Sequence, residues 1–284
     1  MNGSMKALVG NYQFHSYRWG NITTARPLLL LHGFMGCGED FEAVVQAISR
    51  LGGDRPTTTV YALDLPGHGQ TQLENPGQLT DYGIAATAHG VRGWTQLVQP
   101  GPWAIAGYSM GGRLALYLAA NFPNDFPVTV AIGASPGLEF EGDRQTRRAV
   151  DNERAKKLEN CAQTGTFEEF LKNWYQMPLF SNLATHPSFE TMLDRRRQNN
   201  PQLLAYSLRY LGLGQQPFLL PQLANYTGRL DLVVGEHDGK FIEINRAIAR
   251  HCPRARLTII PDCGHTIPLE NPVALAQILA QTLL

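Results

Sequence analysis

Short, continuous apolar runs recur along the chain, and stretches with a different spacing separate them. Such runs are typical of parallel strands that are buried on both faces, because neither face meets water. Several of the stretches between them repeat apolar residues three and four positions apart, as amphipathic helices do. This alternation predicts an α/β fold with a mostly parallel, doubly wound sheet. The runs that predict strands are Pro27–Leu31, Thr57–Leu63, Trp103–Ala106, Val128–Ile132, Leu230–Val234 and Ala255–Ile260.

Two further patterns complete the predicted fold. Asn11–Trp19 alternates aromatic with polar residues, which predicts an edge strand, and a turn is expected to follow at Gly20-Asn21. The stretches with helical periodicity predict helices over Asp40–Leu51, Tyr82–Val98, Arg113–Ala120, Ile242–Arg250 and Pro272–Leu284.

The alternation of strands and helices stops after Gly133. Residues 139 to about 211 are rich in charged side chains and helical periodicity, and they contain no run that predicts a buried strand. Open α/β sheets bind their ligands at the carboxyl edge. We therefore expect residues 1–284 to form a single domain, with a helical insertion at about 139–215 lying as a lid over that edge.

A Gly-x-Ser-x-Gly pentapeptide, residues 107–111, joins the run 103–106 to a predicted helix. The sequence around Ser109 therefore predicts a strand that turns sharply into a helix. Glycine is needed at Gly107 and Gly111 because a Cβ atom there would collide with the crossing chain. The turn exposes the serine hydroxyl, and the unpaired N–H groups of the helix start favour an anion beside it.

A serine hydroxyl reacts only when a neighbouring base takes its proton and an acid orients that base. His265 directly follows the last predicted strand, and Asp238 directly follows the strand before it. Both side chains are thus expected at carboxyl strand ends, on the same edge as Ser109. The three residues predict a catalytic triad in the chain order Ser, Asp, His.

Three other acids are alternatives to Asp238 as the partner of the histidine. Asp231 lies at the wrong end of its strand, and Asp262 is too near His265 in sequence to face it from another loop. Glu236 follows the same strand as Asp238 and stays open. Asp238 is the favoured residue.

A reaction that develops an oxyanion also needs two hydrogen-bond donors. One is the backbone N–H group of the residue after the serine, Met110. The other is expected from Phe34 in the loop that follows the strand 27–31. A simple turn at the end of the strand is the alternative interpretation of His32-Gly33.

The charge balance limits the class of ligand, and the cysteine content predicts the state of the thiols. The chain has 24 Lys and Arg residues against 24 Asp and Glu, without the basic field typical of proteins that bind nucleic acid or anionic membranes. We therefore expect a small-molecule substrate.

No apolar stretch approaches the roughly 18 residues of a membrane helix, and the first residues lack a secretory signal, so a cytoplasmic location is expected. Unpaired, reduced thiols are expected at Cys37, Cys161, Cys252 and Cys263.

Several motifs together resemble the α/β-hydrolase superfamily over nearly the whole chain. They are Leu31–Phe34, Asp64–Gly69, Gly107–Gly112 and Gly264-His265. More selective features resemble the 2-succinyl-6-hydroxy-2,4-cyclohexadiene-1-carboxylate synthase family of menaquinone and phylloquinone biosynthesis. These are Arg113 directly after the serine motif, Gly235–Phe241 around the acid, and the segments 174–180 and 207–217.

The resemblance implies a lyase on a hydrolase fold. In that family the triad makes Ser109 a general base, which removes a ring proton from 2-succinyl-5-enolpyruvyl-6-hydroxy-3-cyclohexene-1-carboxylate, and pyruvate then leaves. No cofactor and no metal are implied, because the leaving group departs without a redox change and the sequence has no metal-ligand cluster or nucleotide loop.

The substrate implied by the resemblance carries three carboxylates, so its pocket needs fixed cations. A planar guanidinium pairs with a carboxylate through two parallel hydrogen bonds. Arg113 matches a binding arginine of the family directly, and Arg144 and Arg196, the latter from the run 195–197, are the best matches for two more. Tyr108 and Trp174 are expected to line the pocket.

Two other classes of function stay open. A carboxylesterase or a carbon–carbon bond hydrolase would use the same triad for nucleophilic attack by Ser109. A non-catalytic binding protein on this scaffold usually lacks a triad residue, whereas all three are present here. We expect a monomer or a weak homo-oligomer.

Overall fold

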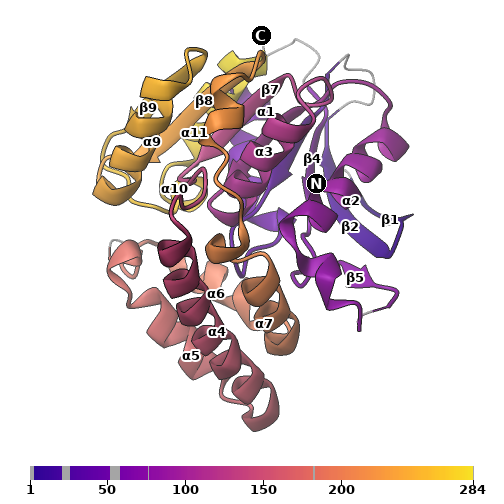
Figure 1. Cartoon of the computed structure of the whole chain (residues 1–284), viewed down its shortest axis with the longest axis vertical. Coiled ribbons are helices and arrows are strands. Elements are labelled where there is room, and N and C mark those ends of the chain that lie inside the picture. The colour runs from indigo at the N-terminus through magenta and orange to yellow at the C-terminus, as the bar shows by residue number, and fades with distance from the viewer. Residues whose placement is uncertain (1–2, 21–25, 52–57, 76, 182, 284) are drawn as a thin grey trace.

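A computed structural model of the chain describes residues 3–20, 26–51, 58–75, 77–181 and 183–283. The described strands form one sheet in the order β1-β2-β4-β3-β6-β7-β8-β9, and β5 pairs with β2 outside this path (Figure 1). The strands are β1 (Gly3–Val9), β2 (Tyr12–Trp19), β3 (Leu28–Leu31), β4 (Val60–Leu63), β5 (Gln72–Leu73), β6 (Ala104–Tyr108), β7 (Val128–Ile132), β8 (Arg229–Gly235) and β9 (Ala255–Ile260).

The sheet is mostly parallel, as predicted. Every neighbouring pair from β4 through β3, β6, β7 and β8 to β9 is parallel, whereas β2 is antiparallel to β1, β4 and β5. All residues of β3, β4 and β7 are buried, which is why their sequences are apolar without alternation.

Helices cover both faces of the sheet. α1 and α11 pack on one face, and α2, α3, α8 and α9 pack on the other. The helices of the described chain are α1 (Glu42–Leu51), α2 (Ile84–Val98), α3 (Met110–Asn121), α4 (Glu141–Thr164), α5 (Phe167–Tyr175), α6 (Phe189–Arg197), α7 (Pro201–Tyr210), α8 (Leu220–Ala224), α9 (Gly239–His251), α10 (Ile267–Glu270) and α11 (Pro272–Leu283), with short 3₁₀ helices η1 (Gly38–Phe41), η2 (Leu79–Tyr82), η3 (Pro178–Phe180) and η4 (Leu213–Gln215).

The prediction of an edge strand over Asn11–Trp19 is wrong in one respect. The strand exists as β2, but it is an interior strand, because β1 pairs along its outer side from Gly3 to Val9. The side chains of β1 are mostly exposed, so its sequence carries no buried pattern. Parts of three predicted elements, at Asn21, Thr57 and Leu284, lie outside the described residues.

The helices α4 to α7 lie between β7 and β8 in sequence and form a separate layer below the sheet in Figure 1. In the described part of residues 133–228 there is no strand, as expected. This helical insertion has its own apolar cluster, which includes Leu158, Leu171 and Leu204. Met35, from the loop after β3, is fully buried in that cluster and ties the insertion to the sheet.

None of the helices in the described ranges is long and apolar enough to cross a membrane.

Candidate active site

The turn around Ser109 has the strained geometry that the pentapeptide predicts. Ser109 lies between β6 and α3 with φ 52° and ψ −106°, a left-handed φ that is uncommon outside glycine. A Cβ atom on Gly107 would overlap the carbonyl of Gly111, and one on Gly111 would overlap the carbonyl of Leu31. The close approach of these backbones fixes the serine at the end of β6.

Replacing Gly107 by alanine should destabilise the fold by about 3 kcal/mol or more, because the added methyl group meets rigid backbone rather than a side chain that can move. Gly142→Ala is the matched control, since no atom outside its chain neighbours and the nearby backbone of α4 lies within 4 Å of the position of its Cβ. The midpoint of urea denaturation measures both changes. Equal midpoints for the two variants would contradict this account of the turn.

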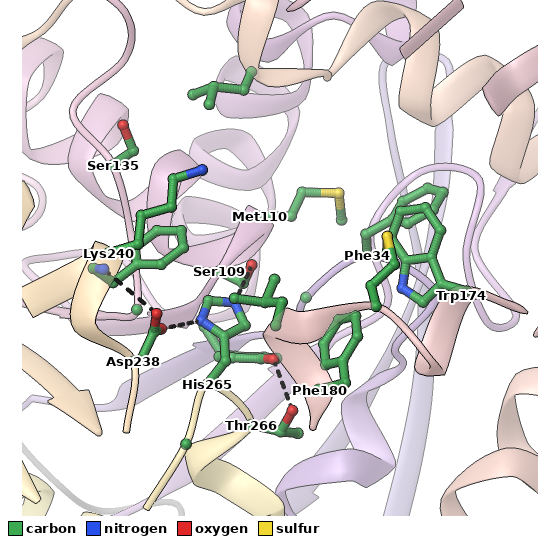
Figure 2. A pocket seen from close by; sticks show the side chains of 18 of the residues that line it. Phe34, Ser109, Met110, Ser135, Trp174, Phe180, Asp238, Lys240, His265 and Thr266 are labelled. Carbon is green, nitrogen blue, oxygen red and sulfur yellow. Dashed lines mark hydrogen bonds and ion pairs between the residues drawn. The ribbon is translucent and has the colours of Figure 1, made fainter. Parts of the chain in front are cut away.

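Ser109, His265 and Asp238 form a continuous chain of contacts (Figure 2). The Oγ of Ser109 lies 3.1 Å from Nε2 of His265, and Nδ1 of His265 lies 2.6 Å from Oδ2 of Asp238. An ionised carboxylate only accepts hydrogen bonds, so Nδ1 carries the proton and Nε2 is left to accept from the serine. His265 and Asp238 are 3% and 6% exposed, so water competes little for these bonds.

The alternative acids have other partners. Glu236 accepts a hydrogen bond from the backbone N–H of Asp262 at 3.0 Å. Asp231 pairs with Arg229 at 2.8 Å. Among the four candidate acids, only Asp238 contacts the imidazole of the histidine.

The loop after β3 lies directly beside the serine. A Cβ atom on Gly33 would be 2.7 Å from Cε1 of Tyr108 and 3.5 Å from Cβ of Ser109. Nε2 of His32 accepts the N–H of Leu65 at 2.9 Å, and its Nδ1 lies 2.8 Å from the carbonyl of Gly33. Burial lowers the pKa of His32, so this imidazole is neutral and holds the loop. Phe34 and Met110 as oxyanion donors stay a prediction.

A cavity of about 650 Å³ opens over the serine. Of the predicted binding residues, Tyr108, Arg113, Trp174 and Arg196 line it, together with Phe34 and Met110. In Figure 2, Phe34 and Trp174 face the triad from the opposite side of this space. Lining residues that the sequence analysis did not predict include Arg147, Arg154, Phe180 and Lys240.

Comparison with known proteins gives the family. The alpha/beta hydrolase fold family matches residues 26–272. The 2-succinyl-6-hydroxy-2,4-cyclohexadiene-1-carboxylate synthase of Serratia proteamaculans (strain 568) is 31% identical over 258 residues, which cover 88% of this chain and 91% of that protein. The chain belongs to this synthase family. It has the α/β-hydrolase fold, with a helical insertion between β7 and β8.

This chain covers very different shares of two further relatives. Protein PHYLLO, chloroplastic, of Arabidopsis thaliana is 30% identical over 258 residues, which cover 86% of this chain but only 14% of that protein. The structure of MenH from S. aureus superposes with a TM-score of 0.84 at 27% identity, covering 97% of this chain and 98% of that one. The similarity to MenH thus extends over both the sheet and the insertion.

In this member of the synthase family, Arg113 is a cavity cation whose hydrogen-bond partners are uncharged. Its guanidinium donates to Oε1 of Gln216 at 3.1 Å and to the carbonyl of Leu211 at 2.9 Å. Burial, with the nearby charge of Arg147, lowers the pKa of Arg113 to about 10. A partly buried cation that is hydrogen-bonded to uncharged groups favours an incoming anion.

The structure does not bring Arg144 to the cavity of the synthase-family chain. Its guanidinium is held by Glu141 at 2.8 Å and by two carbonyls at the start of α4. Arg147, one turn further along α4, lines the cavity instead and donates to Asp151 at 2.9 Å. Arg154 lies 3.9 Å from the same carboxylate and stacks over the ring of Trp174, 5.4 Å from its centroid.

Of the three consecutive arginines 195–197, Arg196 lines the cavity. It is 6% exposed, and its guanidinium contacts both oxygens of Asp40, at 2.9 and 2.7 Å, and the hydroxyl of Tyr175 at 3.1 Å. An acid therefore already balances its charge. Arg195 and Arg197 pair with acids outside the cavity.

The spacing of residues 147, 151 and 154 is a signal that the sequence analysis did not use. Positions i, i+4 and i+7 share one face of a helix, so the two arginines and the aspartate belong to one side of α4. Arg144 and Arg148 pair with Glu141 instead, which has a low pKa of about 2 through these two hydrogen bonds. Phe180 and Lys240 lie in the segments 174–180 and 235–241, and the resemblance of those segments to the synthase family is the signal that could have found them.

Within the described residues, one group of potential metal ligands was found: Glu236, His237 and Asp262, with ligand atoms within 4.8 Å of one another. All three side chains are exposed, and exposed acidic groups are common without an ion. We assign no metal to them. The four cysteines are free and buried, which confirms the prediction of unpaired thiols.

Proposed function

We propose that this protein eliminates pyruvate from 2-succinyl-5-enolpyruvyl-6-hydroxy-3-cyclohexene-1-carboxylate and releases 2-succinyl-6-hydroxy-2,4-cyclohexadiene-1-carboxylate. It is thus a carbon–oxygen lyase of menaquinone or phylloquinone biosynthesis. Membership of the synthase family supports this reaction. The observation that carries the proposal is the contact chain from Asp238 through His265 to Ser109, which opens into a cavity lined by arginines.

In the proposed reaction Ser109 is the base. His265 accepts the serine proton at Nε2 while the serine oxygen takes the ring proton next to the succinyl carbonyl. The electron pair of that C–H bond forms a new ring double bond, the existing double bond shifts, and the bond to the enolpyruvyl oxygen breaks. The enolate that leaves takes up one proton at carbon, which the protonated His265 can supply, and becomes pyruvate. No redox partner enters this balance.

The carbonyl oxygen next to the reacting carbon becomes negative as the proton leaves. Backbone N–H groups of Phe34 and Met110 are proposed to stabilise it, because the loop after β3 and the start of α3 both border Ser109. Donors fixed before the reaction do not have to reorient during it, which lowers the barrier.

The guanidinium groups are proposed to hold the substrate carboxylates. Arg113 is the strongest candidate because its hydrogen-bond partners are uncharged, and Arg147 and Arg154 share the single charge of Asp151. Arg196 is paired with Asp40 and is proposed to contribute less charge. Tyr108 and Trp174 contribute apolar wall, and the helical insertion is proposed to act as the lid of the single domain.

Two parallel assays test the proposal. Supplied with the enolpyruvyl precursor, the protein should release pyruvate at a rate proportional to enzyme concentration, and with p-nitrophenyl esters it should release little phenolate. A carboxylesterase using the same triad would give the opposite result, and a non-catalytic binding protein would give neither product. A cytoplasmic location and a monomeric or weakly associated state stay predictions.

A further inference from the structure

The carboxylate of Glu270 binds the backbone on both sides of His265. His265 lies in the loop 261–266 between β9 and α10, and Glu270 is the last residue of α10. Oε2 of Glu270 accepts the backbone N–H of Gly264 at 2.6 Å, and Oε1 accepts the backbone N–H of Thr266 at 2.8 Å. The residues immediately before and after His265 are therefore bound to the same side chain.

The short helix α10 brings Glu270 back to this loop. The carbonyl of Thr266 accepts the backbone N–H of Glu270 at 2.9 Å, and Ile267 is fully buried beneath the turn. Gly264 lets the carboxylate approach, because a Cβ atom at that position would lie 2.9 Å from Oε2. Charge-assisted hydrogen bonds from two backbone donors hold both ends of a segment more firmly than neutral ones.

His265 needs such support because both of its ring nitrogens have fixed partners. Nδ1 lies 2.6 Å from Asp238, and Nε2 lies 3.1 Å from Ser109. Rotation or displacement of the ring that improves one contact lengthens the other. The imidazole ring of His265 also packs against the ring of Phe241, at 4.7 Å between centroids. That aromatic contact does not fix the position of the backbone at His265.

We propose that Glu270 is a positioning residue. It holds the imidazole of His265 in line between Asp238 and Ser109 by accepting hydrogen bonds from the backbone N–H groups of Gly264 and Thr266. This role rests on the proposed function of the triad as the base. Glu270 also lines the cavity, but its two oxygens are turned to the backbone, so its contribution is to the geometry of His265.

Glu236 provides a matched control, because it directly follows β8 and its carboxylate binds the same loop. Oε2 of Glu236 accepts the backbone N–H of Asp262 at 3.0 Å, a single bond three residues before the histidine. Its side chain is exposed. A variant at this position loses a carboxylate that holds the loop, without loosening the residues that flank His265.

The experiment compares Glu270→Ala and Glu236→Ala in the full chain. For pyruvate release, Glu270→Ala should lower kcat by about 10²-fold with KM changed less than about twofold, as a displacement of a catalytic group near 1 Å does. Glu236→Ala should keep kcat within about twofold. If Glu270→Ala does not fold, Glu270→Gln replaces it, since its amide keeps one acceptor and presents a donor to the second N–H.

Proton NMR supplies a readout that does not depend on the reaction. The downfield resonance of the Nδ1 proton, assigned by its loss in His265→Gln, should shift or broaden in Glu270→Ala and persist in Glu236→Ala. If Glu270→Ala left both the resonance and kcat unchanged, the positioning role would be overturned, whether or not the thermal stability fell. If the wild-type protein released no pyruvate while Glu270→Ala still changed the Nδ1 resonance, the proposed reaction would be refuted and the positioning role of Glu270 would stand.

Discussion

Replacing Ser109 by alanine should lower kcat for pyruvate release by on the order of 10²- to 10⁴-fold, the usual effect of losing a general base. The hydroxyl belongs to a residue that lines the cavity, and it lies 3.1 Å from the imidazole that is proposed to accept its proton. Alanine removes that oxygen and leaves the cations in place. KM should therefore change little, and a coupled assay for pyruvate over a range of substrate concentrations separates the two constants.

Ser135→Ala is the control for this variant. Ser135 also lines the cavity, but its hydroxyl accepts the backbone N–H of Gly137 at 3.2 Å, whereas Nε2 of His265 contacts Ser109. It should keep kcat within a few-fold of the original protein. If Ser109→Ala released pyruvate as fast as Ser135→Ala, the serine would not be the base.

Replacing Arg113 by alanine should raise KM for the precursor by about 10²-fold, in the range for truncating one partner of a buried charge pair. The half-buried side chain lines the same cavity as Ser109, the proposed substrate carries three negative charges, and the hydrogen-bond partners of the guanidinium are uncharged. A neutral ester substrate should be affected much less, because its binding does not require a cation. Initial rates with both substrates give the comparison.

Arg144→Ala serves as the control, because Arg144 lies outside the cavity and is paired with Glu141. It should leave KM within about twofold, as expected for an ion pair exposed to solvent. Arg113→Lys should recover only part of the affinity, since an ammonium lacks the two parallel donors of a guanidinium. Equal KM values for Arg113→Ala and Arg144→Ala would show that Arg113 does not bind the substrate.

The positions of the triad residues were predictable because they depend on strand ends. Ser109, Asp238 and His265 each follow an apolar run, and parallel strands bring their carboxyl ends to one edge of the sheet. The glycines around the serine were predictable for a similar reason, since the close contact is made by backbone. Local sequence is enough where the backbone alone determines the geometry.

The first strand was not predictable from its side chains. β1 is held by backbone hydrogen bonds to β2, and most of its side chains remain exposed, so no apolar alternation marks it. Without β1, the strand Tyr12–Trp19 looked like the edge of the sheet. Its residues are mostly buried because sheet neighbours and helices cover it on both sides.

The cations could be predicted as a type but not each by position. Arg144 and Arg147 are about one turn apart on α4, and which of them enters the cavity depends on how that helix docks against the rest of the fold. Arg196 does face inward, but its partner Asp40 lies 156 residues away in sequence. Contacts of this range depend on how the insertion docks, which local patterns do not encode.

The chain encodes the proposed reacting groups separately from part of the proposed set of substrate-binding cations. Arg147 and Arg154 belong to α4, which is encoded between β7 and β8, whereas the triad is encoded in the turns after β6, β8 and β9. An engineer could therefore rewrite one contiguous stretch of the gene to admit a differently charged guest. The proton-transfer machinery would be inherited unaltered.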